Sequence, residues 1–174
     1  KLDEWRTRRR PEVLQITDGM RLPLLGQVLE VRVAVGANRA LWNALTPPVL
    51  TLFLRSPDDA ARVLEKALRK RAPDLFGERL ALFAAEMGLA LPPLSLSSAR
   101  TRWGSCRLKT GIRLNWRLIH FPPPVIDYVV VHELAHLREM NHSARFWAIV
   151  AQYYPEHRSA RSELKRLAAT CPHW

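Results

Sequence analysis

Alternating apolar and polar positions characterise the first third of the chain. Residues 28–33 alternate at period two, and residues 51–54 form a short apolar run after the proline pair at 47–48. An earlier apolar stretch begins at residue 13, and turn residues at 18–19 separate it from these two runs. Short strands joined by turns predict a small antiparallel or mixed sheet within residues 13–54.

The next stretch carries the signals of a helix start. Ser56 is a good capping residue, Pro57 suits the first helical position, and two acids follow in the first turn. Apolar residues at helical spacing then continue up to Gly88, which predicts the end of the helix. Pro73 lies inside this stretch and predicts a break or kink, so we expect two backing helices within residues 57–87.

Alternation returns in residues 94–97, which run into residues 101–106, and again in residues 112–116. The turn residues at 109–111 predict that these two strands form a hairpin beside the helix that follows them. An apolar, valine-rich run follows at residues 125–131. Valine favours strands, but three prolines directly before the run are a helix-entry signal, and a strand would send residues 132 and 133 to opposite faces. We therefore predict a helix over residues 124–140.

Two histidines and a glutamate lie near the end of that helix, in the order His132, Glu133, His136. Histidines four residues apart on a helix are about 40° apart and one turn up, so both can share one metal ion. Glu133 can then face a metal-activated water. This is the H-E-x-x-H pattern of zinc metallopeptidases, in which the glutamate is the general base. The helix is too apolar to lie on the surface. Burying two histidines and a glutamate without partners would be costly, and a bound metal ion would offset that cost.

A catalytic zinc needs a third protein ligand as well as an open position. Glu139 is too far along the helix, about 10.5 Å of rise beyond the first histidine. His142 would lie about 120° off the metal-facing stripe if the helix continued, so the helix must stop before it. Asn141 can adopt the left-handed conformation that turns the chain back. We favour His142 as the ligand over the downstream alternatives, Glu156 and Glu163.

Other side chains near the motif have two interpretations each. Cys106 is either a fourth metal ligand, since thiolate suits zinc, or a small buried thiol. Arg102 and Tyr128 are candidates to stabilise an oxyanion, with packing as the alternative. The remaining histidines have no partner pattern and are assigned to the surface or to packing: His120, His157 and His173.

Composition bounds the class of protein. The chain has 174 residues, of which 48% are hydrophobic, enough for one domain with a real core. It contains no apolar run of about 18 residues that would span a membrane. Only two cysteines occur and no secretory signal is visible, so we expect a reducing, cytoplasmic setting.

The formal charge of +11 predicts weak, sequence-independent attraction to nucleic acid. The alternative is dispersed charge that only keeps the chain soluble. If the charge forms a face, we expect it away from the metal, around residues 62–71 or at the arginine cluster in residues 6–10. Acids interrupt the basic helix, which weakens the prediction.

Several motifs together carry a resemblance. They are Arg102-Trp103-Gly104-Ser105-Cys106, Leu114-Asn115-Trp116-Arg117-Leu118-Ile119, the segment from Asp127 to Leu137, and Asn141-His142-Ser143 with Phe146-Trp147. In these residues the chain resembles the YgjP-like metallopeptidase family, a relative of the SprT-like and WLM (Wss1-like) zinc proteases. The resemblance implies a minimal zincin fold, bound zinc, and a site of His132, Glu133, His136 and His142. Repair of DNA–protein crosslinks belongs to the SprT-like and WLM relatives and extends here only by analogy.

We therefore expect a single α+β domain over residues 1–174, with a strand-rich part at 13–54, backing helices at 57–87 and a catalytic core at 94–155. Its expected activity is hydrolysis of peptide bonds in a protein or peptide substrate, with Zn²⁺ bound by His132, His136 and His142 and Glu133 as general base. Two alternatives remain: a nucleic-acid-associated protease that acts on DNA-bound proteins, and a catalytically idle, metal-stabilised scaffold.

Overall fold

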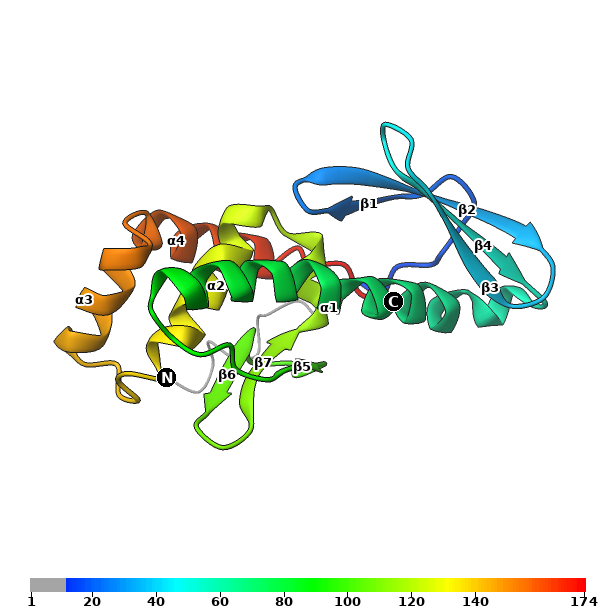
Figure 1. Cartoon of the computed structure of the whole chain (residues 1–174). Helices are drawn as coiled ribbons and strands as arrows, with labels where there is room; N and C mark the ends of the chain where they lie inside the picture. Colours follow the sequence, from blue (N-terminus) through cyan, green and yellow to red (C-terminus); the bar gives the residue numbers. More distant parts are fainter. Residues whose placement is uncertain (1–11) are drawn as a thin grey trace, which may run out of the picture.

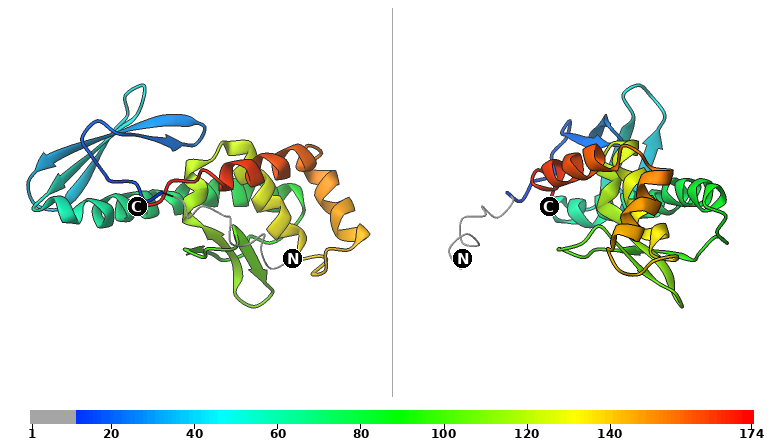
Figure 2. Two further views of the ribbon diagram at one scale, coloured as in Figure 1. Left: turned by 180° about the vertical axis from the view of Figure 1, so that it is seen from behind. Right: turned by 90° about the vertical axis from the view of Figure 1, so that its left-hand side faces the viewer.

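Two small β-sheets lie near opposite ends of one long helix, α1 (Ala60–Glu86), in the computed structural model (Figures 1 and 2). The structure describes residues 12–174, so the arginine cluster in residues 6–10 lies outside it. Sheet A covers the first half of α1. Sheet B lies beside its second half, together with the three shorter helices.

Sheet A has the strand order β1-β2-β4-β3 and is mixed. Its strands are β1 (Arg21–Leu24), β2 (Gln27–Val35), β3 (Arg39–Asn43) and β4 (Val49–Leu54). β2 and β4 pair in parallel, whereas the other two pairs are antiparallel. Alternate residues of β4 are buried, as the apolar run predicts. The sequence prediction missed β3, and residues 13–16 form no strand.

Helix α1 runs without interruption through Pro73, so the prediction of two helices was wrong. A proline removes one backbone donor and crowds the preceding turn. Here Ala72 and Phe76 on either side of it are fully buried, and this packing holds the helical path. Ser56 caps the preceding turn as predicted, and Gly88 ends the helix with a φ of +65°.

Sheet B consists of β5 (Leu94–Ser97), β7 (Gly111–Asn115) and β6 (Gly104–Arg107), in that order. A hairpin forms at the predicted turn, between β6 and β7. The predicted first strand, which began at residue 94, was wrong in one respect: it is split in two, and its first part, β5, pairs in parallel with the other edge of β7. The inner face is apolar, since Ile112 and Leu114 are fully buried. Arg113 between them is exposed. The second face of the sheet is open around Arg113, whereas Gly111 and Asn115 on the same side of β7 are buried.

The helix that carries the metal motif is α2 (Pro123–Ala135), and it lies at the centre of this half. It contacts α1, β6, α3 (Ala144–Tyr153) and α4 (His157–Ala168), and a 3₁₀ turn (Trp116–His120) leads into it. Burial on all sides explains why its sequence is apolar all round. A bidentate ion pair fixes it to α1: Arg79 Nε and Nη2 lie 2.6 and 2.8 Å from the carboxylate oxygens of Asp127.

The fold is therefore α+β with small mixed sheets and backing helices, which confirms the predicted class. Across residues 12–174, no helix combines the length and the apolar character needed to cross a bilayer.

Candidate metal centre

Three histidine side chains converge at the end of α2. The Nε2 atom of His142 lies 3.2 Å from Nε2 of His132 and 3.1 Å from Nε2 of His136. Among the described residues, these three form the one group of His, Cys, Asp and Glu side chains close enough to hold a metal ion together. The structure thus brings together all three histidines that the sequence predicted as ligands.

The spacing of the three nitrogens fits a tetrahedral metal. Two nitrogens at about 2.05 Å from zinc, with a tetrahedral angle between them, lie about 3.3 Å apart. The observed distances of 3.1 and 3.2 Å agree with this value. Three neutral imidazoles and no thiolate are the donor set of an open, catalytic zinc site, because a fourth position remains.

The backs of two rings are oriented by polar partners. His136 Nδ1 lies 3.2 Å from the carbonyl oxygen of Glu139, to which it donates. His132 Nδ1 lies 3.5 Å from the hydroxyl of Tyr128. A proton on Nδ1 leaves Nε2 unprotonated and free to bind a metal. Glu139 therefore acts through its backbone, while its side chain points to Arg145.

Burial favours the neutral form of His132 and His136, which metal binding requires. Burial, together with the neighbouring His136, His142 and Arg161, lowers the pKa of His132 to about 3. Burial also lowers the pKa of His136. An aromatic wall from α3 contributes to this burial: Phe146 stacks on His136 at 4.5 Å between ring centroids, and Trp147 stacks on His142 at 6.1 Å.

The chain reaches the third histidine by ending the helix early. α2 stops at Ala135 rather than near residue 140, and a short turn follows. Ser143 then begins α3, its side chain accepting a hydrogen bond from the Phe146 amide. The left-handed conformation predicted for Asn141 is wrong, because Leu25 is the one non-glycine residue with positive φ in the described chain. The turn is made by residues with ordinary backbone angles.

Glu133 lies between α2 and sheet B and is 6% exposed. Burial raises the pKa of its carboxyl to about 7, while the charge of Arg102 opposes this rise. Its side chain presses against Gly104 of β6: a Cβ at that glycine would lie 2.9 Å from Glu133 Cγ and 3.0 Å from Oε1. Only a glycine admits the carboxylate at this distance, so β6 fixes where Glu133 can sit.

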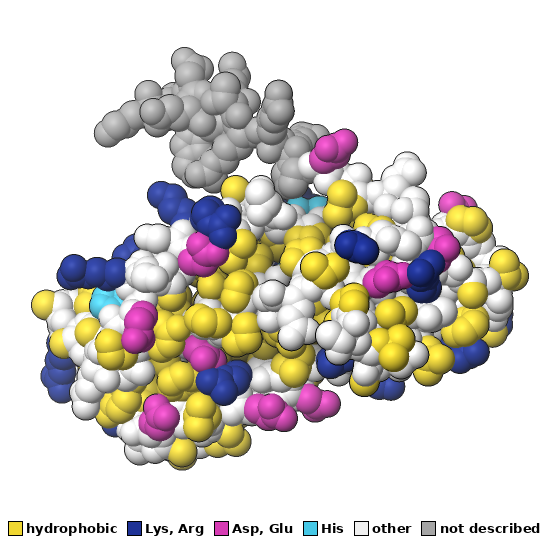
Figure 3. Space-filling model, turned by 90° about the horizontal axis from the view of Figure 1, so that it is seen from above, with side chains coloured by type: hydrophobic (Ala, Val, Ile, Leu, Met, Phe, Trp, Pro, Cys, Tyr) yellow, Lys and Arg dark blue, Asp and Glu magenta, His cyan; other side chains and the backbone are white. Residues whose placement is uncertain are grey.

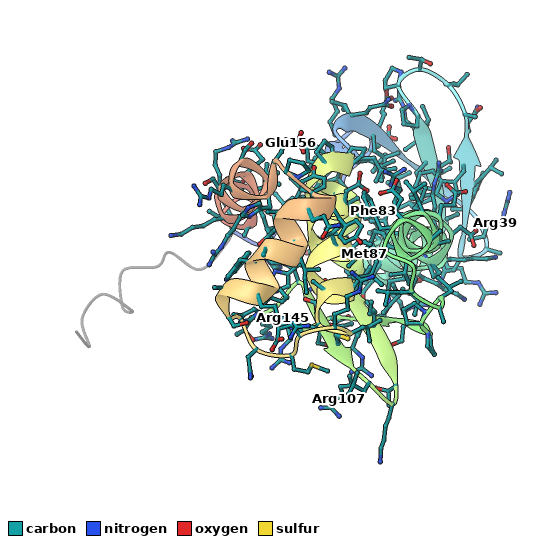
Figure 4. All side chains as sticks on the ribbon, turned by 60° about the vertical axis from the view of Figure 1, so that its left-hand side comes forward. Arg39, Phe83, Met87, Arg107, Arg145 and Glu156 are labelled. Atoms are coloured by element: carbon teal, nitrogen blue, oxygen red, sulfur yellow. The ribbon has the colours of Figure 1, made fainter. Side chains whose placement is uncertain are left out.

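The other candidate ligands lie outside the histidine group. Cys106 is on β6, and burial raises the pKa of its thiol to about 11, which matches the buried-thiol interpretation. Glu163 is bound to Arg166 on α4. Arg145 lies at the start of α3, close to His142, whereas Glu156 follows the other end of this helix (Figure 4). Glu156 is therefore separated from the histidines by the length of α3.

Tyr128 does not face the open side of the centre. It is 4% exposed, and its hydroxyl contacts Nδ1 of His132, so it orients this predicted ligand, which matches the packing interpretation. Arg102 is exposed and close enough to Glu133 to act on its charge, so it remains a candidate for the oxyanion. His157 stacks on Trp147, and His120 is buried away from the site.

Sequence reasoning missed two residues that shape the centre. Arg161 of α4 lies over the Trp147 ring at 5.1 Å, and its charge lowers the pKa of His132. No local pattern connects it with a motif 29 residues earlier. Gly104 was part of a quoted motif, but its role depends on a contact between β6 and α2 that spacing along the chain does not reveal.

Comparisons with known proteins agree with a metal site. A family model described as "YgjP-like, metallopeptidase domain" matches residues 1–167. The UTP pyrophosphatase of Escherichia coli (strain K12) is 25% identical over 137 residues, which cover 76% of this chain and 72% of that protein.

Two solved structures share part of the fold. The metallopeptidase zymogen of Pyrococcus abyssi abylysin is 24% identical and covers 53% of this chain and 90% of its own, with a TM-score of 0.47. The metallopeptidase zymogen of Methanocaldococcus jannaschii jannalysin is 20% identical and covers 53% and 93%, with a TM-score of 0.46.

Proposed function

The chain belongs to the YgjP-like metallopeptidase family, and from this premise we propose that it is a zinc-dependent endopeptidase with Glu133 as general base. The observation that carries the proposal is the convergence of three Nε2 atoms at 3.1–3.2 Å beside a buried glutamate. His132, His136 and His142 would hold the metal. When bound, zinc would lower the pKa of a coordinated water toward ~7 and polarise the scissile carbonyl.

Glu133 supplies the proton transfers. Its carboxylate accepts a proton from the attacking water and then donates it to the leaving nitrogen of the peptide. A carboxyl with a pKa of about 7 suits both steps, because it can exist in either form near neutral pH. Gly104 holds it in place from the β6 side. Arg102 would stabilise negative charge that develops on the substrate oxygen.

A second candidate substrate comes from the curated relative. The name UTP pyrophosphatase suggests that the same centre hydrolyses a nucleoside triphosphate. Two arginines next to the centre favour an anionic substrate: Arg102 beside Glu133, and Arg161 beside His132. Water would attack phosphorus, an anhydride bond would break, and Glu133 would again accept the proton of the water.

One set of measurements tests both substrates. Purified protein is analysed for metal and then incubated with a proteome-derived peptide mixture and, separately, with UTP. We expect about one zinc per chain, peptide cleavage by the wild type, and its loss in Glu133→Ala with zinc retained. Cleavage of UTP but not of peptides, also lost in Glu133→Ala, would replace the first proposal by the second. Zinc with neither reaction would identify an idle scaffold.

A further inference from the structure

One segment of the sequence concentrates positive charge. Residues 87–126, which are 40 residues long, contain six Arg and Lys residues and no Asp or Glu. Elsewhere in the chain acids and bases alternate more evenly. This acid-free segment builds the whole of sheet B and the loop that joins β5 to β6.

The strand register places two of these bases on the open face of the sheet. Arg113 pairs with Ser105 across the hairpin and with Ser95 on β5, and Arg107 pairs with Gly111. Directly paired residues share a face, as do residues two apart on one strand, so Arg107 and Arg113 lie on the same side. That side is opposite to the buried Ile112 and Leu114.

The main chain of the loop from β5 to β6 crosses this side at the end of β7 and carries two more exposed bases, Arg100 and Arg102. Asn115 has the same parity as Arg113, and its side-chain amide donates to the carbonyl oxygens of Ala99 and Arg102. The loop is thereby fastened across the open side of β7. We call the set of Arg100, Arg102, Arg107, Lys109 and Arg113 the outer basic face; all five are exposed. Arg107 lies at the outer end of the hairpin, away from the core (Figure 4).

None of these five bases forms a salt bridge with a residue in the described part of the chain. Arginines of α1 differ, because Arg62 pairs with Asp59 and Arg69 with Glu65. On the side of the molecule opposite to sheet B, acidic and basic side chains are interspersed (Figure 3). The segment that builds sheet B contains no acidic residue, whereas Glu65, Asp74 and Glu78 are interspersed with the bases of α1.

We propose that the outer basic face binds a nucleic-acid strand through its phosphates. Six residues of an extended strand span about 20 Å. The row of bases from the loop to the hairpin turn is therefore longer than the diameter of a single small anion. A repeated phosphate charge matches such a row. Ser95 and Ser105 flank Arg113 on neighbouring strands and offer hydroxyl donors to phosphate oxygens.

The face adjoins the metal centre through Arg102, whose charge acts on Glu133. A bound strand would therefore lie beside the site and would hold proteins attached to it within reach. Binding itself does not depend on hydrolysis, so the two properties are tested separately. Contacts to phosphates carry no sequence information, and the predicted binding has no base preference.

The test is fluorescence anisotropy with a labelled single strand of about 20 nucleotides, longer than the ~4–16 that one small domain covers. The double variant Arg107→Glu/Arg113→Glu is compared with Lys66→Glu/Lys70→Glu, which makes the same charge change at exposed positions of α1. We expect the first to weaken binding at least about tenfold at low salt, and the second less than about threefold. The slope of the logarithm of the binding constant against the logarithm of the salt concentration should also become less steep in the first variant. The expected change is about 0.7 for each phosphate that the variant no longer neutralises.

Three results would overturn the proposal: no binding by the wild type at micromolar protein in low salt, equal weakening in both double variants, or equal competition by poly-glutamate of the same length. Arg107→Gln/Arg113→Gln serves as a milder second variant if charge reversal unfolds the sheet. Both sheet variants should retain zinc and cleave a small uncharged peptide at the wild-type rate. A wild-type protein that binds the strand but cleaves no peptide would affect only the proposed function.

Discussion

The two sheets of this protein are built alike and used differently. Each is small and mixed, and each packs one face onto helices. In sheet A the base of an interior strand, Arg32, pairs with both Asp18 and Glu30, and the sheet contributes no residue to the histidine group. Sheet B lies in a segment without acidic residues, and its Gly104 lies against Glu133, the proposed general base. In the proposed function, sheet A is a scaffold, whereas sheet B borders the site of the chemistry.

The largest expected effect lies in the metal half. His142→Ala should weaken zinc binding about a thousandfold, because a structural zinc site is worth ~10–16 kcal/mol shared among its ligands. Glu163→Ala is the matched control, and we expect unchanged affinity, since that glutamate is bound to Arg166 on α4. A competition titration with a chelator measures both. Zinc loss in Glu163→Ala with His142→Ala still loaded would reverse the ligand assignment.

The opposite behaviour is expected of sheet A. Leu52 is fully buried on β4 between the sheet and the helix, and Leu52→Ala should lower the free energy of unfolding by about 3 kcal/mol. The remaining folded protein should keep its kcat/KM within about twofold, because no residue of sheet A belongs to the centre. Urea unfolding and an assay well below the transition measure the two quantities. A large loss of kcat/KM in folded Leu52→Ala would end the distinction between scaffold and site.

The site was predictable from the sequence because its chemistry is local. His132, Glu133 and His136 lie within five residues of one helix, and His142 follows one short turn later. Helical geometry alone places the first two ligands on one stripe, and the need for a third ligand selects the next histidine. The signals at Ser56 and Gly88 were equally local, and both were confirmed.

The sequence predictions that were wrong or incomplete concern features that depend on contacts between distant segments. Pro73 breaks an isolated helix, but burial of Ala72 and Phe76 against other elements outweighs its cost. β3 forms because it pairs with β4. The apolar and polar residues of β3 alternate too weakly for the sequence alone to predict a strand. The face shared by Arg107 and Arg113 was also missed, since it required the register of β6 on β7. Long-range packing decided each of these points.

Gly104→Ala tests the contact by which sheet B serves catalysis. The new Cβ would meet Glu133 at 2.9–3.0 Å and push the carboxylate from its position. General bases contribute about 10²–10⁴-fold, so we expect kcat/KM to fall about a hundredfold with zinc retained. Gly77→Ala is the control: nothing lies within 4 Å of its Cβ, and it should stabilise α1 by up to ~1 kcal/mol without changing activity. Full activity in folded Gly104→Ala would show that β6 does not position the base.

The smallest predicted effect concerns His120, which joins the two halves. Its Nδ1 donates to the carbonyl oxygen of Pro23 on β1 at 2.8 Å, and the ring is 2% exposed between Trp116 and Trp174. Burial lowers the pKa of His120 from its ordinary value of 6.5 to about 4. The unfolded chain therefore takes up a proton before the folded one does, and stability falls as the pH drops from 6.5 toward 4.

Between pH 7.5 and pH 5 this shift should remove about 2 kcal/mol of stability. His120→Gln keeps a donor for Pro23 but does not titrate, so its free energy of unfolding should decline less over the same range by that amount. Both proteins are compared by urea unfolding in the metal-free form, kept so by a chelator. The histidines of the metal centre then titrate equally in both proteins, and the difference between them reports His120 alone. Parallel pH curves would mean that His120 is already charged, or unburied, at neutral pH. A difference of the expected sign would show that acid loosens the contact that holds sheet A to the metal half.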